Sequence, residues 1–359
     1  MSNSINTGAT LTIDLGSLRQ NYLNLSNQLK SSELASVVKA DAYGLGVKEI
    51  ASTLLAAGCK TFFVATLDEG IELRQILPTT KIYVLHGVLA DTAKLFVSNN
   101  LIPVLNSLEQ IEEWRSHKHH VAGLHVDTGM GRLGLTPKEY LNTDRLKNYN
   151  IDLIISHLAC AEQNEHPKNK DQLDLFKLLL NTRSARHVSL AASSGIFLGP
   201  NYHFNLCRAG ASILGINPTF NLPNPMEQVV SLRAEIIQIR SVDTPQTVGY
   251  GASYQVTKPA RIATLAVGYA DGYMRTLGNK GVTYIGEYEV PTVGRISMDL
   301  TTVDVTNIPD NLLSVGTQVD LIGPNNSIDQ IAKQAGTIGY EILTALGKRF
   351  ERRYVLTEK

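Results

Sequence analysis

Eight short apolar runs mark the first part of this chain, and stretches with helical spacing separate them. The runs cover residues 35–38, 62–65, 82–85, 102–105, 121–126, 153–156 and 188–191, with a last one near Leu206. The intervening stretches include residues 69–76, 91–98, 108–114 and 171–180. Strands that alternate with helices usually pair in parallel, because each helix returns the chain to the same end of the sheet. Eight such units predict an α/β fold of the (β/α)8 barrel type, with an open doubly wound sheet as the alternative.

The first strand and helix of the chain are expected before these runs. Residues 11–14 alternate apolar and polar side chains, which predicts an edge strand. Leu18, Tyr22, Leu25 and Leu29 follow at helical spacing and predict an amphipathic helix.

The pattern changes after residue 228. Period-two segments replace the alternation of strands and helices, and they cover residues 230–239, 261–267, 282–293, 301–305 and 319–322. Successive strands without long helices between them predict a mainly antiparallel β domain. Residues 217–225 contain three prolines and are interpreted as the linker. We therefore expect a barrel domain over residues 1–228 and a β domain over residues 229–359.

Charge and cysteine content argue against several classes of partner. The chain has 33 basic and 33 acidic side chains, so no nucleic acid or other polyanion is expected. The first ten residues contain neither a basic segment nor an apolar core, and no apolar run approaches the roughly 20 residues that span a bilayer. Cys59, Cys160 and Cys207 lack paired spacing, which favours reduced thiols. A cytoplasmic protein without membrane contact is expected.

The apolar run at residues 35–38 leads directly into Lys39 and then into Ala-Asp-Ala-Tyr-Gly-Leu-Gly46. A lysine at the end of a buried strand is surrounded by apolar side chains, and desolvation then favours its neutral, nucleophilic amine. A lysine whose charge reaches solvent is an equally good interpretation of the run alone. Tyr43, Gly44 and Gly46 add a hydroxyl and backbone N–H groups for a phosphate. A reactive lysine beside a phosphate site suggests pyridoxal phosphate (PLP).

Two small polar loops follow the seventh and eighth runs. Ser193, Ser194 and Gly195 form the first loop, and Arg208-Ala-Gly-Ala211 forms the second. Either loop alone is more often an ordinary turn. In a barrel, however, the loops after strands seven and eight commonly bind phosphate. Together with Lys39 they predict a cofactor site at the carboxyl ends of the strands.

These motifs carry a resemblance to a known family. Val38-Lys-Ala-Asp-Ala-Tyr-Gly-Leu-Gly46 resembles the cofactor-attachment motif of bacterial alanine racemases. Further similar motifs are Asp127-Thr-Gly-Met-Gly-Arg-Leu-Gly134, Val248-Gly-Tyr-Gly-Ala-Ser-Tyr254, Gly268-Tyr-Ala-Asp-Gly-Tyr273 and Val293-Gly-Arg-Ile-Ser-Met-Asp299. The resemblance spans nearly the whole chain. It implies a PLP-dependent racemase that interconverts L- and D-alanine for peptidoglycan, and a homodimer with shared active sites.

The resemblance also implies roles for individual residues. Lys39 would bind PLP and act as the base on one face of the substrate, and Tyr250 from the partner subunit would act on the other face. His157 and Arg208 would lower the pKa of that tyrosine. The phosphate would contact Tyr43, Ser194, Gly210 and Ala211. The substrate carboxylate would contact Arg132, Met298 and Asp299, and Tyr269 and Arg275 would line the entrance.

Arg208 has a specific consequence for the chemistry, since by resemblance it faces the pyridine nitrogen of PLP. An arginine with its ordinary pKa above about 12 donates a hydrogen bond without giving up the proton. The ring then stays unprotonated and withdraws fewer electrons, which favours racemisation over transamination.

Two positions depart from the family pattern. Many relatives carry a carbamylated lysine where this chain has His125, so another group must support Arg132. Lys348 stands approximately where many relatives have a tyrosine that contacts the phosphate and narrows the entrance. A changed entrance could widen substrate choice. The tract His117-Lys-His-His120 has no matching ligands and is interpreted as a solvated loop, so no metal site is expected.

Three other functions remain open at this point. A racemase of a larger amino acid or of a broader set of amino acids would use the same residues. A decarboxylase that shares the barrel would also bind PLP. A non-catalytic PLP carrier protein would have the barrel but lack the β domain.

Overall fold

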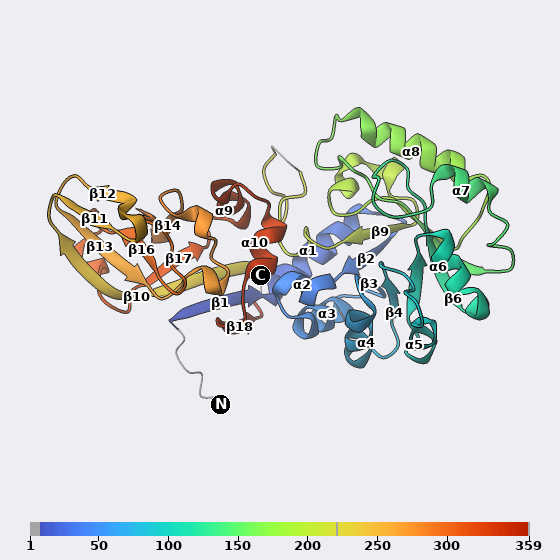
Figure 1. Ribbon diagram of the computed structural model, residues 1–359, viewed down its shortest axis with the longest axis horizontal. Helices are drawn as coiled ribbons and strands as arrows, with labels where there is room; N and C mark the ends of the chain where they lie inside the picture. Colours follow the sequence, from blue (N-terminus) through green and yellow to red (C-terminus); the bar gives the residue numbers. More distant parts are fainter. Residues whose placement is uncertain (1–7, 220–221, 358–359) are drawn as a thin grey trace. The chain divides into compact units, whose positions relative to one another are not determined.

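The computed structural model describes residues 8–219 and 222–357. The chain forms two compact units (Figure 1). The barrel unit comprises Leu18–Glu227, and the β unit comprises Met1–Ser17 together with Gln228–Lys359. The expected boundary after residue 228 lies next to this division. The segment before Leu18, which the sequence pattern grouped with the barrel, is part of the β unit instead.

Parallel strands in chain order build the barrel unit. Their order in the sheet is β8-β7-β6-β5-β4-β3-β2-β9. The bounds are β2 Glu33–Val37, β3 Thr61–Val64, β4 Lys81–Val84, β5 Ile102–Leu105, β6 Val121–His125, β7 Asn150–Ile155, β8 His187–Ser189 and β9 Leu206–Ala209. The Arg208 N–H donates to the Ala191 carbonyl at 3.0 Å, which joins the last strand to the segment after β8 and closes the ring. The predicted barrel is confirmed, and the open sheet is excluded.

Helices separate these strands along the chain. Their bounds are α1 Leu15–Gln28, α2 Lys39–Gly44, α3 Val47–Ala56, α4 Leu67–Ile76, α5 Ala93–Ser98, α6 Leu108–Glu113, α7 Pro137–Asn142 and α8 Pro167–Leu180. The start of α4 is fixed by a capping box, in which the Thr66 hydroxyl accepts from the Glu69 N–H and the Glu69 carboxylate accepts from the Thr66 N–H. Glu69 also contacts the segment after Lys39, where it accepts from the Ala40 N–H.

Large side chains fill the barrel interior. Ala35, Phe63, Tyr83, Val104, Leu153, Ile155 and Leu206 form one buried cluster contributed by six of the strands. The rings of Phe63 and Tyr83 stack with centroids 4.9 Å apart. The barrel is therefore a packed core, and chemistry is confined to the ends of its strands.

The β unit is built around the long strand β10 (Val230–Val242). β1 (Ala9–Asp14) lies between β10 and β18 (Glu351–Val355), antiparallel to the first and parallel to the second. The prediction of an edge strand at residues 11–14 is therefore wrong, because β10 and β18 pair with both of its sides. The other strands are β11 Gln246–Val248, β12 Tyr254–Val256, β13 Ala260–Leu265, β14 Val282–Ile285, β15 Tyr288–Pro291, β16 Thr301–Asp304 and β17 Gln318–Ile322.

Most pairs in the β unit are antiparallel, as predicted. Two helices that the sequence pattern did not predict, α9 (Ile328–Ala335) and α10 (Gly339–Ala345), precede β18. The predicted linker at residues 217–225 contains two positions, 220 and 221, outside the described residues. Among the rest, the Asn224 side chain donates to the Gly215 carbonyl at 2.9 Å.

Candidate active site

Lys39 is separated by one residue from the end of β2, as predicted for a strand-end lysine, but the chain after it is not an irregular loop. Ala40, Asp41, Ala42 and Tyr43 all have φ between 51° and 56°, so they form a left-handed turn. Non-glycine residues occupy this region at a cost of roughly 1–2 kcal/mol each, and such strain persists only where the surroundings impose it.

Two carboxylates hold this left-handed turn in place. The Glu69 side chain accepts from the Ala40 N–H at 2.8 Å, and the Asp41 side chain accepts from the Val47 N–H at 2.7 Å. The Gly46 N–H donates to the Asp41 carbonyl at 3.0 Å. The expectation that the Gly46 N–H is free for a phosphate is therefore wrong. The turn instead fixes where Lys39 and Tyr43 lie.

The surroundings of Lys39 favour its neutral amine. Burial lowers the pKa of Lys39, and the Arg132 guanidinium lowers it further, whereas Glu69 acts in the opposite direction. The sequence argument anticipated the desolvation but not the contribution of Arg132. A lysine with a lowered pKa is a competent nucleophile near neutral pH.

Arg208 on β9 is a buried cation without a carboxylate partner among the described residues. Its Nη1 donates to the Ser189 hydroxyl at 2.5 Å, and its Nη2 donates to the Ser156 carbonyl at 2.9 Å. Burial lowers the pKa of Arg208 to about 10, below the expected range yet above neutrality. Arg208 therefore keeps its charge, and hydrogen bonds from neutral acceptors fix its orientation.

His157, after β7, is neutral beside this cation. Burial, followed by the charge of Arg208, lowers the pKa of His157 to about 3. Its Nδ1 lies 3.3 Å from the Arg208 Nη2, which can only donate. Nδ1 therefore accepts, and the ring proton is assigned to Nε2 from this network.

A buried glutamine that sequence reasoning missed holds the His157 segment. The Gln172 side chain on α8 donates to the His157 carbonyl at 2.9 Å and accepts from the Ala159 N–H at 2.8 Å. It also donates to the Thr128 hydroxyl, which in turn bonds to the Ser156 hydroxyl at 2.8 Å. The segments after β6 and β7 are thereby tied together.

His125 at the end of β6 is neutral as well. The Asn106 side-chain nitrogen donates to the carbonyls of Leu85 and Val104, which directs the Asn106 oxygen to the His125 Nδ1 at 2.8 Å. His125 must then donate from Nδ1 and keep a free lone pair on Nε2. Burial, with the charge of Arg208, lowers the pKa of His125 to about 4.

Asp127 organises the glycine-rich turn that carries Arg132. Its carboxylate accepts from the N–H groups of Gly129, Met130 and Gly131 at 2.7–2.8 Å. Within the described residues, Asp127 and Arg132 form no ion pair with each other. Arg132 is exposed and has no ion pair or hydrogen bond to the part of the chain that the structure describes. Its guanidinium remains available for an anionic ligand.

The predicted phosphate loops meet Tyr43. A Cβ atom placed on Gly210 would lie 2.3 Å from the Tyr43 hydroxyl, so only glycine allows this approach. The Ser193 hydroxyl accepts from the N–H groups of Gly210 and Ser212 at 3.1 and 3.2 Å. Ser194 begins the 3-10 turn Ser194–Leu198, and Ala211 follows Gly210. Ser193, which the sequence argument grouped with Ser194, is the residue that joins the two loops.

This donor set fits PLP. Arg132 and Arg208 place two cations at the strand ends, which suits a phosphate. Tyr43 supplies a hydroxyl that lies against the backbone of Gly210, where a Cβ atom would not fit. Lys39 supplies the amine that PLP requires.

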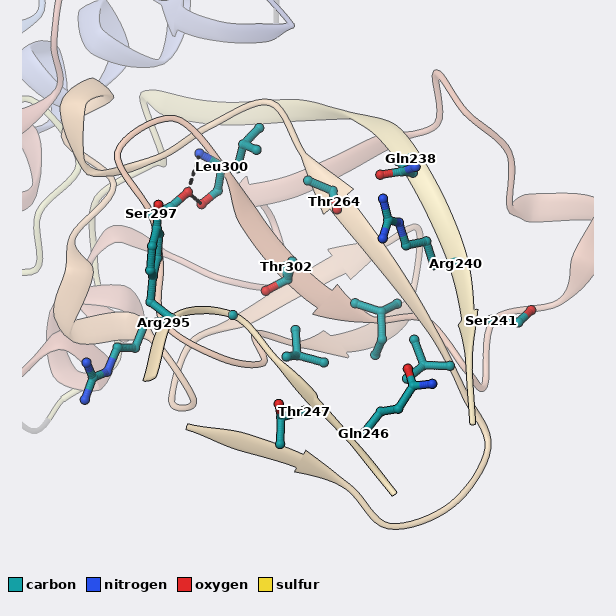
Figure 2. A pocket seen from close by; sticks show the side chains of 15 residues that line it. Gln238, Arg240, Ser241, Gln246, Thr247, Thr264, Arg295, Ser297, Leu300 and Thr302 are labelled. Atoms are coloured by element: carbon teal, nitrogen blue, oxygen red, sulfur yellow. Dashed lines mark hydrogen bonds between the residues drawn. The ribbon is translucent and has the colours of Figure 1, made fainter. Parts of the chain in front are cut away.

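The β unit holds the other candidate residues. Tyr250 begins the short 3-10 turn Tyr250–Ala252 and is 70% exposed. It lines a cavity of about 690 Å³ together with Arg295, Ser297 and Thr302. Figure 2 shows polar side chains around this cavity, among them Gln238, Arg240 and Thr264. The side of the β unit that carries Tyr250 is thus hollowed, and both polar and apolar side chains line the hollow.

Tyr269, Met298 and Asp299 come together in the same unit. The Tyr269 N–H donates to the Ser297 carbonyl at 3.0 Å, and the Ala270 N–H donates to the Met298 carbonyl at 2.9 Å. Arg275 begins the turn Arg275–Leu277, and a Cβ on Gly278 would lie 3.2 Å from the Arg295 Cα. The N–H groups of Met298 and Asp299 have no acceptor within residues 8–219 and 222–357.

The neutral state of His125 predicts a pH dependence of stability. The unfolded chain protonates this histidine with a pKa near 6.5, whereas the folded chain does so only near 4. Stability is therefore highest above pH 6.5 and falls as the pH drops toward 4, by about 2 kcal/mol at pH 5 from this residue. Urea unfolding at pH 7.5 and pH 5 measures this loss. His125→Gln should lose about 2 kcal/mol less between the two values, and an equal loss would contradict the assignment.

Comparison with known proteins finds matches to both units of the chain. "Alanine racemase, N-terminal domain" matches residues 13–218, and "Alanine racemase, C-terminal domain" matches residues 229–354. The chain is 45% identical to the alanine racemase of Rhodospirillum rubrum over 96% of each chain. It is 41% identical to the biosynthetic alanine racemase of Agrobacterium fabrum, over 97% of this chain and 94% of that protein.

Solved structures give the same result. The alanine racemase of Bartonella henselae, with covalently bound pyridoxal phosphate, matches with a TM-score of 0.93 and 39% identity, over 97% of this chain and 99% of that chain. The biosynthetic alanine racemase of Pseudomonas aeruginosa matches with a TM-score of 0.90 and 32% identity over the same shares. No helix among the described residues is long and apolar enough to cross a membrane. The chain belongs to the alanine racemase family, PLP-dependent isomerases that interconvert L- and D-alanine and supply D-alanine for peptidoglycan.

Proposed function

We propose that Lys39 carries PLP in this chain and that the barrel unit is its cofactor domain. Tyr43, Ser194, Gly210 and Ala211 hold the phosphate in this proposal. The single observation that carries it is the left-handed turn, which fixes Lys39 at a strand end while placing the Tyr43 hydroxyl against Gly210. When bound, PLP withdraws electrons from the substrate and acidifies the proton on its α-carbon.

Arg208 directs this chemistry toward racemisation by facing the pyridine nitrogen. Its guanidinium can only donate, and its pKa of about 10 keeps the proton on the arginine at neutral pH. Ser189 and Ser156 hold the planar group in one orientation. Arg208 would thus donate a hydrogen bond to the PLP nitrogen without protonating it, which would limit electron withdrawal.

Two bases act from opposite faces of the substrate. Lys39 takes or returns the α-proton on one face, and its low pKa supports that role. Tyr250 serves the other face. An ordinary tyrosine, with a pKa near 10, is a poor base at neutral pH and needs donors at its oxygen. His157, with its proton on Nε2, is a suitable donor.

Tyr250 reaches the site from a second copy of the chain in this proposal. Its 70% exposure within its own unit supports a residue that another subunit covers. The active form is then a homodimer with two shared sites. The unpaired Cys59, Cys160 and Cys207 support a reducing, cytoplasmic location.

The substrate carboxylate binds Arg132 and the N–H groups of Met298 and Asp299. Arg132 is exposed and unpaired among the described residues, and a guanidinium binds a carboxylate through two parallel hydrogen bonds. Tyr269 and Arg275 line the entrance from the β unit. The match to the C-terminal family domain supports a racemase over a carrier protein that has only the barrel.

Borohydride reduction of the holoenzyme tests the attachment site. Reduction fixes PLP to the amine that holds it, and peptide mapping should find the label on Lys39. Lys39→Ala should remain unlabelled, while the exposed Lys30→Ala should label as the parent does. A label on any other lysine would contradict the proposal.

Tyr250→Phe tests the second base. Because one base serves each face, exchange of solvent deuterium from the tyrosine face should fall by about 10²-fold or more, and the other half-reaction should fall far less. Equal small losses in both directions would assign Tyr250 another role.

Mixing variants tests whether the site is shared. Tyr250→Phe and Lys39→Ala homodimers should each have little activity, and subunit exchange should restore part of it, since one heterodimer site keeps both bases. Light scattering and tagged subunits confirm the exchange. No recovery after exchange would indicate a site built within one chain.

A further inference from the structure

Arg349 connects three segments of the β unit that surround the proposed carboxylate site. Its Nε lies 2.8 Å from a carboxylate oxygen of Asp271, and its Nη1 lies 2.8 Å from a carboxylate oxygen of Asp299. Asp271 belongs to the segment of Tyr269, and Asp299 follows Met298. Arg349 itself lies between α10 and β18, next to Lys348.

The three segments are also joined through their backbones. The Gly347 N–H donates to the Asp271 carbonyl at 2.9 Å, and a Cβ on Gly272 would lie only 1.9 Å from the Ala345 carbonyl. A Cβ on Gly268 would lie 2.3 Å from the Met298 carbonyl. Such close approaches need glycine at both positions. Backbone contacts therefore hold the segment that precedes Arg349.

The two carboxylates differ in their surroundings. The Asp271 side chain is only 6% exposed, and its second oxygen accepts from the Gly268 N–H at 2.9 Å. The Asp299 side chain is 55% exposed and has Arg349 as its one charged partner among the described residues. Asp271 thus anchors Arg349, and Arg349 pairs with the exposed carboxylate of Asp299.

A free Asp299 carboxylate would oppose substrate binding. The substrate carboxylate is proposed to accept from the N–H groups of Met298 and Asp299, one residue from this side chain. Two like charges at such a distance repel each other, and a paired cation removes most of the repulsion. The pair with Arg349 also engages one Asp299 carboxylate oxygen at 2.8 Å.

We propose that Arg349 is a positioning residue for the substrate carboxylate, which neutralises Asp299 so that the backbone N–H groups at residues 298 and 299 can bind a monocarboxylic amino acid. This inference rests on the proposed carboxylate site. It adds a residue that touches neither substrate nor cofactor, and it assigns the Asp299 side chain to Arg349 and not to the substrate.

Steady-state kinetics of Arg349→Met in the holoenzyme tests the role. The KM for alanine should rise by about 5- to 10-fold, with kcat changed by less than about 3-fold, because substrate binding is what the exposed charge opposes. Raising the salt from about 20 mM to about 500 mM should remove most of this rise, since exposed charges are screened. The dissociation constant of propionate, measured by calorimetry, should follow the same pattern without turnover.

A double variant separates charge from structure. Adding Asp299→Asn to Arg349→Met should bring KM within about 2-fold of Asp299→Asn alone, because the exposed side chain at residue 299 then carries no charge. Arg353→Met is the matched control, since Arg353 pairs only with Glu351 on its own strand among the described residues. Arg349→Lys, which keeps a cation, should show a smaller rise in KM and replaces Arg349→Met if that variant does not fold.

The outcomes distinguish this inference from the proposed function. An unchanged KM in Arg349→Met, with a raised KM in Arg132→Lys, would overturn the role of Arg349 and keep the carboxylate site. An unchanged KM in both would overturn the site itself. A raised KM that responds neither to salt nor to Asp299→Asn would show a merely structural Arg349 and would contradict the inference.

Discussion

The arrangement of the site depends on one buried cation, Arg208. The backbone N–H of Arg208 closes the barrel, and its side chain is buried. One residue therefore contributes both to barrel closure and to the charge of the site. Burying a charge without a carboxylate is costly unless hydrogen bonds satisfy it. Ser189 and the Ser156 carbonyl provide them. Burial, followed by the charge of this cation, keeps His157 and His125 neutral. A strand end with a buried cation beside neutral histidines is suited to an anionic cofactor.

Neutral hydrogen-bond partners determine which ring nitrogen carries the proton in each of the two histidines. His157 accepts from Arg208 and has its proton on the opposite nitrogen, while His125 donates to Asn106 and has a free lone pair. The buried side chains of Asn106 and Gln172 fix these choices from neighbouring segments. In the β unit, Arg349 pairs with the Asp299 carboxylate. In our proposal this pair keeps the negative charge of Asp299 from opposing the substrate carboxylate.

Much of the fold could be predicted because its signals are local. Apolar runs separated by helical spacing identify the barrel strands, and Lys39 follows from the end of one run. The edge strand was wrong because β1 pairs with strands more than two hundred residues away. The left-handed turn gave no signal, since Ala40 to Tyr43 include no glycine, and its hydrogen bond from Glu69 is a tertiary contact. Arg349, Gln172 and Asn106 were missed for the same reason, because only the fold brings them to their partners.

Replacing Arg208 by glutamate tests the central claim most directly. A carboxylate beside the pyridine nitrogen can stabilise a proton on that nitrogen. The native guanidinium cannot, because it can only donate hydrogen bonds. Racemisation by Arg208→Glu should fall by about 100-fold, while transamination per turnover, measured as pyruvate and pyridoxamine phosphate, should rise. Arg208→Lys keeps the charge without the planar group and should lose racemisation without added transamination. Normal racemisation by Arg208→Glu with no added transamination would contradict the account.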